Sequence, residues 1–156
     1  MYNYEHEIEC PDNKAIRKFL WNDYFHDSEL LDIRFDREWR KVLLTLESCR
    51  DIDNAWERLK GDGDTRHQYI EGHKDEYIYT LLFLGTVYFH VERMMYCGDY
   101  INGRFKDTAL LRRLQSGSKK PLYHFRIQFA DGYADILFDG FQIRKQTGRV
   151  NYAIPY

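Results

Sequence analysis

The chain has 156 residues, of which 44% are hydrophobic and 31% are charged, and its formal net charge is −2 at pH 7. This composition is typical of one globular domain covering residues 1–156, and it excludes an intrinsically disordered chain. The small net charge does not require a nucleic acid or a membrane surface as a partner. The acidic N-terminus lacks the features of a signal peptide, and no uncharged run reaches the about 20 residues that span a bilayer. We therefore expect a cytoplasmic protein with no membrane partner, in which the three cysteines stay reduced.

The first half of the chain predicts a helix and a β-hairpin. Apolar residues at helical spacing predict a helix over residues 12–25, which ends near His26-Asp27-Ser28. Alternating apolar residues then predict strands over 29–36 and 39–47, with a turn at Arg37-Glu38. This register places Ile33 opposite Val42 and Leu31 opposite Leu44. Because Arg and Glu are poor residues for a two-residue hairpin turn, a longer loop is the alternative.

The middle of the chain predicts a second short helix over 52–60 and an exposed loop from 61 to 74. Tyr77–Leu84 is apolar on both faces, which predicts a central strand covered on both sides. After a turn or bulge at Gly85-Thr86, alternation predicts a strand with one solvent-exposed face. The stretch 95–106 contains two glycines and is expected to be irregular.

The last third predicts a short helix and a hairpin. Asp107 is the expected N-cap of the helix, which ends near Ser116-Gly117. Asp131-Gly132 is a favoured type I′ turn, and closing it pairs Ile127 with Ile136 and Phe125 with Phe138. Phe141 and Ile143 predict one further strand.

These elements predict an α+β fold with a single curved antiparallel sheet of six or seven strands and about three helices packed on one face. The prediction rests on the segregation of helices and strands along the chain, since alternating helices and strands would instead indicate a parallel sheet.

No motif predicts a catalytic residue, a cofactor or a metal. The adjacent residues His26-Asp27-Ser28 carry the groups of a hydrolase triad, but neighbours in sequence diverge, whereas a triad needs convergence from separate segments. Asp62-Gly63-Asp64 lacks the rest of a calcium loop, and His67 and His73 lack the paired spacing of a zinc site. The sequence therefore leaves catalytic activity open and favours a protein without one.

Aromatic and charged residues predict a binding surface instead. Aromatic residues make up 17% of the chain, and a tyrosine-rich sheet face is typical of a ligand cleft or a protein interface. The candidate surface consists of Tyr77, Tyr79, Tyr88, His90, Glu92, His124 and Arg126. The leading hypothesis is that the chain binds another protein. The first alternative is an enzyme or small-ligand protein with a cleft lined by tyrosine and histidine. The sequence does not decide whether the protein forms a homodimer.

Charge is distributed unevenly along the chain. Residues 1–100 contain 13 Lys/Arg against 21 Asp/Glu, a net charge of −8, whereas residues 101–156 contain 10 against 4, a net charge of +6. Basic residues gather between 104 and 126, next to Tyr123 and His124. Clustered basic residues beside aromatic ones are typical of nucleic-acid binding, which is the second alternative function.

The chain also loosely resembles several small uncharacterised bacterial protein families. The resemblance rests on His26-Asp27-Ser28 followed by Leu31-x-Ile33 and a hairpin, on Phe83-x-Gly85-x-Val87, and on the hairpin from Phe125 to Phe138. Some of these families are thought to be immunity proteins that neutralise polymorphic toxins. The resemblance implies a toxin as the protein partner and implies no catalytic residues. The acidic first hundred residues would suit a basic nuclease toxin.

Overall fold

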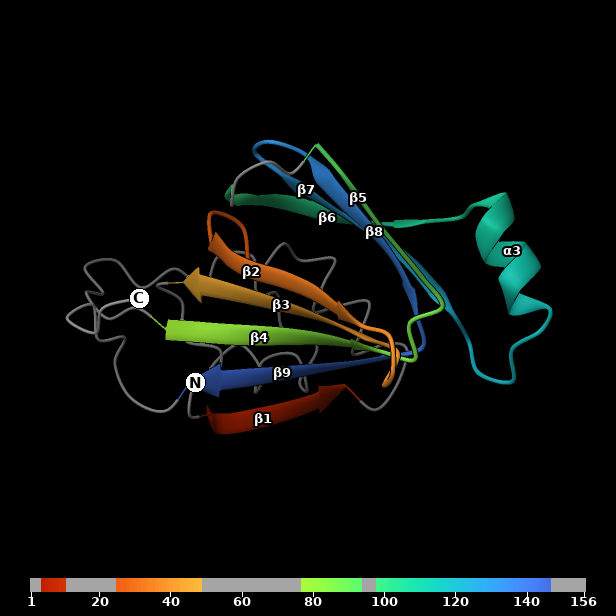
Figure 1. Cartoon of the computed structure of the whole chain (residues 1–156), viewed down its shortest axis with the longest axis horizontal. Coiled ribbons are helices and arrows are strands. Elements are labelled where there is room, and N and C mark those ends of the chain that lie inside the picture. The colour runs from red at the N-terminus through yellow and green to blue at the C-terminus, as the bar shows by residue number, and fades with distance from the viewer. Residues whose placement is uncertain (1–3, 11–24, 49–76, 94–97, 147–156) are drawn as a thin grey trace, which may run out of the picture.

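The computed structural model describes residues 4–10, 25–48, 77–93 and 98–146 (Figure 1). The helix predicted over 52–60, the loop predicted over 61–74, and all but the last residue of the helix predicted over 12–25 lie outside these residues. Phe25 itself belongs to a turn that leads into the first strand of the predicted hairpin.

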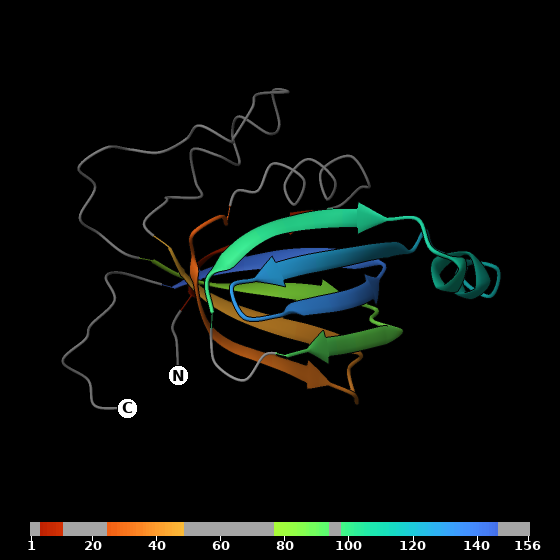
Figure 2. The same cartoon turned by 90° about the horizontal axis from the view of Figure 1, so that it is seen from above.

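The described strands form two antiparallel sheets (Figure 1). The first sheet has five strands in the order β1 (Tyr4–Cys10), β9 (Gly140–Gln146), β4 (Tyr77–Leu84), β3 (Lys41–Ser48) and β2 (Glu29–Asp36). The second has four strands in the order β5 (Tyr88–Glu92), β8 (Tyr133–Phe138), β7 (Tyr123–Phe129) and β6 (Tyr100–Lys106). The helix α3 (Ala109–Gln115) connects β6 to β7 and projects beyond the end of the sheets (Figures 1 and 2).

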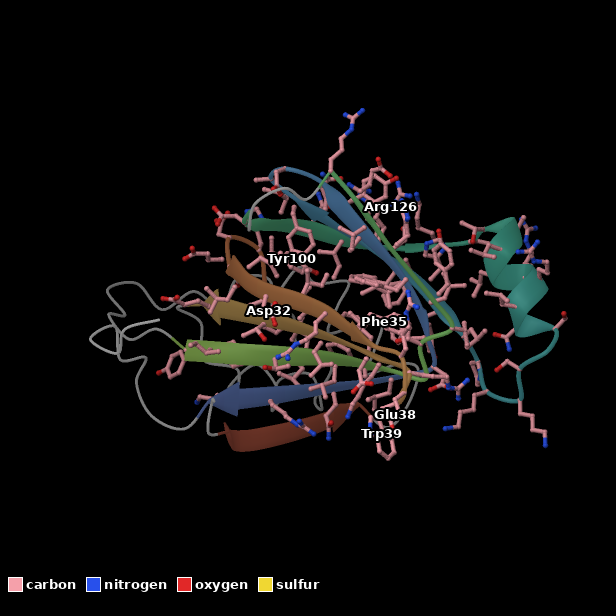
Figure 3. All side chains as sticks on the ribbon, in the orientation of Figure 1. Asp32, Phe35, Glu38, Trp39, Tyr100 and Arg126 are labelled. Carbon is pink, nitrogen blue, oxygen red and sulfur yellow. The ribbon has the colours of Figure 1, made fainter. Side chains whose placement is uncertain are left out.

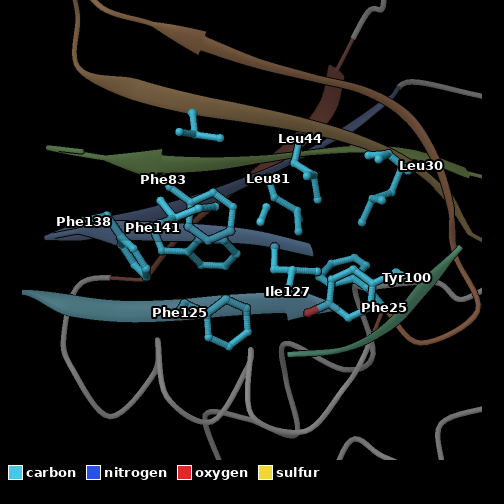
Figure 4. Packing of buried hydrophobic residues seen from close by; sticks show 14 of the residues in the cluster. Phe25, Leu30, Leu44, Leu81, Phe83, Tyr100, Phe125, Ile127, Phe138 and Phe141 are labelled. Carbon is cyan, nitrogen blue, oxygen red and sulfur yellow. The ribbon is translucent and has the colours of Figure 1, made fainter. Parts of the chain in front are cut away.

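The two sheets pack against each other through aromatic side chains (Figure 4). Phe83 of β4 is fully buried, and its ring centroid lies 5.0 Å from that of Phe138 and 6.5 Å from that of Phe125. Phe138 and Phe125 belong to β8 and β7, so these contacts join one sheet to the other. Aliphatic residues from both sheets extend this core toward the end where Phe25 and Tyr100 lie in contact.

The predicted α+β fold with one six- or seven-stranded sheet and about three helices is wrong. The described residues are mostly β, with one short helix and two sheets. Alternation shows that each strand has an apolar face but does not show what covers that face. We expected helices against the sheet, whereas the apolar face of β7 and β8 packs against β4 and β9 of the other sheet.

Several elements follow the sequence prediction closely. The strand β4 has the predicted bounds, lies at the centre of its sheet and is buried on both faces. The further strand predicted around Phe141 and Ile143 is β9. The short helix is α3, although Thr108 rather than Asp107 is its N-cap, because the Thr108 hydroxyl accepts the amide of Leu111 at 3.2 Å.

Both predicted hairpins exist, but their registers are wrong. Phe35 pairs with Val42 and Ile33 with Leu44 around a four-residue turn, so the longer loop is confirmed. In the last hairpin Phe125 pairs with Ile136, and the two turn residues are Ala130 and Asp131. The predicted and observed pairings keep the same faces together, so apolar matching could not distinguish them. The Ala130 amide donates to the carbonyl of Asp99 at 3.0 Å, which ties this turn to the segment before β6.

The prediction that residues 95–106 are irregular is also partly wrong, since Tyr100–Lys106 forms β6. Its Gly103 pairs with Ile127 and lies directly under the ring of Phe125. A Cβ atom at position 103 would lie 2.0 Å from Cζ of Phe125. The glycine therefore makes room for a core aromatic ring and does not interrupt the strand.

Candidate functional site

Polar side chains cover the outer face of the four-stranded sheet, on the side away from the core. Residues that pair directly across antiparallel strands share a face, so the registers place these side chains in rows. One row runs from His90 through Asp135 and Arg126 to Arg104. We call this surface the polar sheet face, and its polar residues are Tyr88, His90, Glu92, Asn102, Arg104, Lys106, His124, Arg126, Gln128, Tyr133 and Asp135. The buried Leu137 lies on the same face, between Tyr88 and His124.

Asp135 of β8 is the centre of the polar sheet face. Its carboxylate accepts two hydrogen bonds from Arg126, from Nε to Oδ1 at 2.9 Å and from Nη2 to Oδ2 at 2.7 Å. His124 Nε2 lies 2.9 Å from the same Oδ1. The side chains of His124 and Asp135 are both only 7% exposed. The side chain of Arg126, which is labelled in Figure 3, is 34% exposed. The network thus has a buried carboxylate and a cation that reaches the solvent.

This arrangement keeps Asp135 ionised. Burial alone would favour the neutral acid, but the hydrogen bonds from Arg126 and His124 outweigh it and hold the pKa of Asp135 below its ordinary value. The reciprocal hydrogen bond raises the pKa of Arg126. Both members of the pair are therefore charged at neutral pH, and Asp135 fixes the direction of the Arg126 side chain.

His124 links this centre to α3. Its Nδ1 lies 3.0 Å from the hydroxyl of Thr108, which also caps α3. Because an ionised carboxylate only accepts hydrogen bonds, Nε2 of His124 donates to Asp135. In the neutral ring Nδ1 then accepts from Thr108.

The hydroxyl, imidazole and carboxylate of Thr108, His124 and Asp135 lie in the order of a hydrolase triad, but their other contacts assign them a structural role. Thr108 accepts the amide of Leu111, and both carboxylate oxygens of Asp135 accept from Arg126. The three groups thus cap the N-terminus of α3 and orient Arg126, and we assign no nucleophile among them.

The rim of the polar sheet face is more exposed. The Arg126 guanidinium carbon lies 4.0 Å from the centroid of the Tyr133 ring, which is a cation–π contact. His90 Nε2 lies 2.9 Å from a carboxylate oxygen of Glu92, and these two side chains are 44% and 45% exposed. A fixed arginine and an adjacent tyrosine are thus flanked by a solvent-accessible histidine–glutamate pair.

The structure brings five of the seven predicted surface residues together on this face, namely Tyr88, His90, Glu92, His124 and Arg126. It does not bring Tyr77 and Tyr79 there. Both belong to β4 in the other sheet, where Tyr79 is fully buried and packs edge-to-face on Phe25 at 5.8 Å. The Tyr77 ring lies beneath Lys145 Nζ at 4.6 Å. Alternation assigned these tyrosines to one face of their strand but could not assign that strand to a sheet.

Sequence reasoning missed Asp135. A signal existed, because Asp135 is a charged residue within an apolar strand and the hairpin brings β8 beside β7. The predicted register placed it two positions away from Arg126 along β7, whereas the observed register makes Asp135 and Arg126 direct partners.

The basic residues between 104 and 126 do not form one surface. Arg104, Lys106 and Arg126 belong to the polar sheet face by register. Arg112 lies 3.7 Å from the carboxylate of Asp107. The remaining three, Arg113, Lys119 and Lys120, line a cavity beside α3.

Within the described ranges, no group of three or more His, Cys, Asp or Glu residues could hold a metal ion. Among the same residues, no helix has the length and apolar character needed to cross a membrane. Comparisons with protein-family models, with curated proteins and with solved structures find no match to this chain.

Proposed function

We propose that this protein acts by binding another protein through the polar sheet face. The observation that carries the proposal is the Asp135-centred network, which fixes Arg126 beside Tyr133 on an accessible sheet surface. Arginine and tyrosine are enriched among the residues that contribute most to protein–protein affinity. A side chain that is already oriented loses less conformational entropy on binding, so the fixed arginine favours association.

The charge of the face indicates the chemistry of the partner. Arg104, Lys106 and Arg126 oppose Glu92 and Asp135, so the face carries a net charge of +1 when its histidines are neutral. Asp135 already neutralises Arg126, which leaves Arg104 and Lys106 to attract acidic groups. The partner would therefore present carboxylates toward β6 and hydrogen-bonding groups toward His90 and Glu92.

We further propose, from the sequence resemblance, that this binding is of the immunity type and neutralises a toxin in the cytoplasm. The sequence alone suggested a basic nuclease as the toxin, because the first hundred residues are acidic. The polar sheet face is not acidic, so it would not attract a basic nuclease. A toxin whose contact surface is acidic suits this face better.

The experiment compares two pairs of exposed charged residues. The test variant is His90→Ala/Glu92→Ala, on edge strand β5 of the polar sheet face. The matched control is Asp32→Ala/Arg34→Ala, an ion pair with the same sequence spacing on edge strand β2 of the other sheet, where Asp32 is labelled in Figure 3. Its two side chains lie 3.2 Å apart and are 51% and 68% exposed. Each tagged protein captures partners from a lysate of its native cells, and mass spectrometry quantifies them.

A stoichiometric protein that the control retains and the test variant loses supports the proposal. Loss of the captured protein from both variants, or from the control variant alone, would contradict the proposal. If the captured protein is toxic to cells without this chain and harmless with it, the immunity-type role is supported as well. A captured protein without toxicity would retain the binding role and exclude the immunity role.

A further inference from the structure

A cavity of about 590 Å³ lies at the end of the sandwich, where several connections meet beside α3. Its wall includes Arg40 from the β2–β3 turn, Val87 from the β4–β5 turn, Asp139 from the β8–β9 turn and the segment between α3 and β7. Cavities of this volume are typical of sites for small molecules of nucleotide size. This cavity does not belong to the polar sheet face.

Four cations and a single carboxylate line the cavity. The cations are Arg40, Arg113, Lys119 and Lys120, and the carboxylate is Asp139. Within the described part of the chain, none of the four cations forms an ion pair. Like charges that line one cavity repel one another, and a bound anion would relieve that repulsion. The local charge therefore favours an anionic ligand.

The segment that carries the lysines is held in place by hydrogen bonds. The Gln115 side chain donates to the carbonyl of Lys120 at 3.0 Å and accepts the amide of Leu122 at 2.6 Å. The Ser118 hydroxyl donates to the carbonyl of Lys120 at 2.9 Å, and the Ser118 amide donates to the carbonyl of Gln115 at 3.1 Å. The backbone beneath the two lysines is thus preorganised, which lowers the entropic cost of binding.

The opposite turn is fixed in the same way. Arg40 has a positive φ of 49°, and its carbonyl accepts the amide of Thr86 at 2.7 Å. The Thr86 hydroxyl donates to the carbonyl of Phe83 at 2.8 Å. The β2–β3 and β4–β5 turns are therefore joined, and the backbone that carries Arg40 is held next to Val87.

The cavity also has an apolar surface. Val87 is 42% exposed, which is unusual for a large hydrophobic residue in this structure, and Leu114 and Leu122 line the same cavity. An inorganic anion would leave these side chains in contact with water. A ligand that combines an apolar ring with an anionic group would cover them and reach the cations.

We propose that this cavity binds a small phosphorylated molecule, with its phosphate held by Arg113, Lys119, Lys120 and Arg40 and its apolar ring on Val87, Leu114 and Leu122. Arginine and lysine are the side chains that bind phosphate, through charge-assisted hydrogen bonds. Asp139 would accept a hydrogen bond from a hydroxyl or amino group of the ligand. The cations come from two separate segments that line one cavity and do not form a stripe along one element, which favours a small molecule over a nucleic-acid strand.

The test is an NMR titration of the full ¹⁵N-labelled chain with phenyl phosphate, the simplest probe that has both the ring and the phosphate. We expect saturable shifts at the amides of Val87, of residues 116–120 and of Leu122. Phenol lacks the phosphate and inorganic phosphate lacks the ring. We therefore expect each of them to bind at least about tenfold more weakly than phenyl phosphate. The variant Arg113→Gln/Lys120→Gln should weaken phenyl phosphate binding about tenfold or more.

The neighbouring variant Arg112→Gln is the matched control, because Arg112 lies on the same helix, faces Asp107 and does not line the cavity. It should leave binding unchanged. The proposal is overturned if phenyl phosphate causes no saturable shift at these amides, or if Arg112→Gln weakens binding as much as the double variant. Binding of a short single-stranded oligonucleotide without any effect of phenyl phosphate would also overturn it, in favour of a nucleic-acid surface.

Discussion

The guanidinium of Arg126 holds both carboxylate oxygens of Asp135, its direct partner across the β7–β8 ladder. Two-point contact between a planar guanidinium and a carboxylate fixes the orientation of both groups as well as their distance. Because Asp135 is buried and Arg126 reaches the solvent, the buried carboxylate fixes the orientation of a guanidinium at the surface. The stability of the sheet and the proposed interface both depend on this pair.

Replacing Asp135 with Asn should lower the free energy of unfolding by about 2–3 kcal/mol, because Arg126 and His124 both lose their ionic acceptor. The partial exposure of Arg126 allows water to offset part of the loss. Urea denaturation followed by circular dichroism measures the effect. The control Glu92→Gln removes a carboxylate from an exposed pair and should change stability by about 0.5 kcal/mol or less. Equal effects of the two substitutions would refute the central role of Asp135.

Acid should remove the contribution of Asp135. The folded-state pKa of Asp135 lies below its unfolded value of about 3.9, so its stabilising effect is complete above that value and is lost as the pH falls through the folded pKa. The difference in unfolding free energy between the native chain and Asp135→Asn should therefore be constant from about pH 7 to pH 5 and narrow below about pH 4. Urea titrations at each pH measure this difference. A difference that widens in acid would contradict the assigned direction of the pKa shift.

Thr108 should be replaceable only by a residue that keeps the hydroxyl. Thr108→Ala removes the cap of α3 and the contact with His124, and should cost about 1–2 kcal/mol of unfolding free energy. Thr108→Ser retains the oxygen that makes both contacts and should stay close to the native stability. Thermal unfolding of the alanine and serine variants measures the two changes in stability. If serine and alanine are equally destabilising, the hydroxyl does not carry the effect.

Gly103 should not tolerate a side chain. A Cβ atom there would lie 2.0 Å from Phe125 and 2.7 Å from the Tyr100 hydroxyl, so Gly103→Ala should cost about 1–3 kcal/mol through overpacking of the core. Gly117 is the matched control, because the nearest atom to its added Cβ lies 3.9 Å away. Gly117→Ala should change stability by about 0.5 kcal/mol or less in urea denaturation. A tolerated alanine at 103 would show that Phe125 can move away.

The sequence predicted the strands well where burial repeats at every second residue. The central position of β4 follows from eight consecutive residues with no charge, and the pairing of the two hairpins follows from matching apolar faces. Register could not be predicted in the same way, because shifting a hairpin by two positions keeps Phe125 on the apolar face. The contacts that fix the last hairpin, such as that between Ala130 and Asp99, join segments that are distant in sequence.

The candidate site was predictable only in part for a related reason. The alternation of Tyr88, His90 and Glu92 identifies a polar strand face, and Arg126 belongs to another such face. Their union into one surface depends on β8 lying between β5 and β7, which nothing in the local pattern indicates. The same lack of long-range information placed Tyr79 on the surface, although it is buried between the sheets.

The most direct test of the central claim is site-specific photo-crosslinking in native cells. A photoreactive amino acid replaces His90 on the polar sheet face or Arg34 on the exposed edge of the other sheet. We predict a crosslinked protein partner from position 90 and none from position 34. Crosslinking of the same partner from position 34 alone, equal crosslinking from both positions, or no crosslink from position 90 would contradict binding through the polar sheet face.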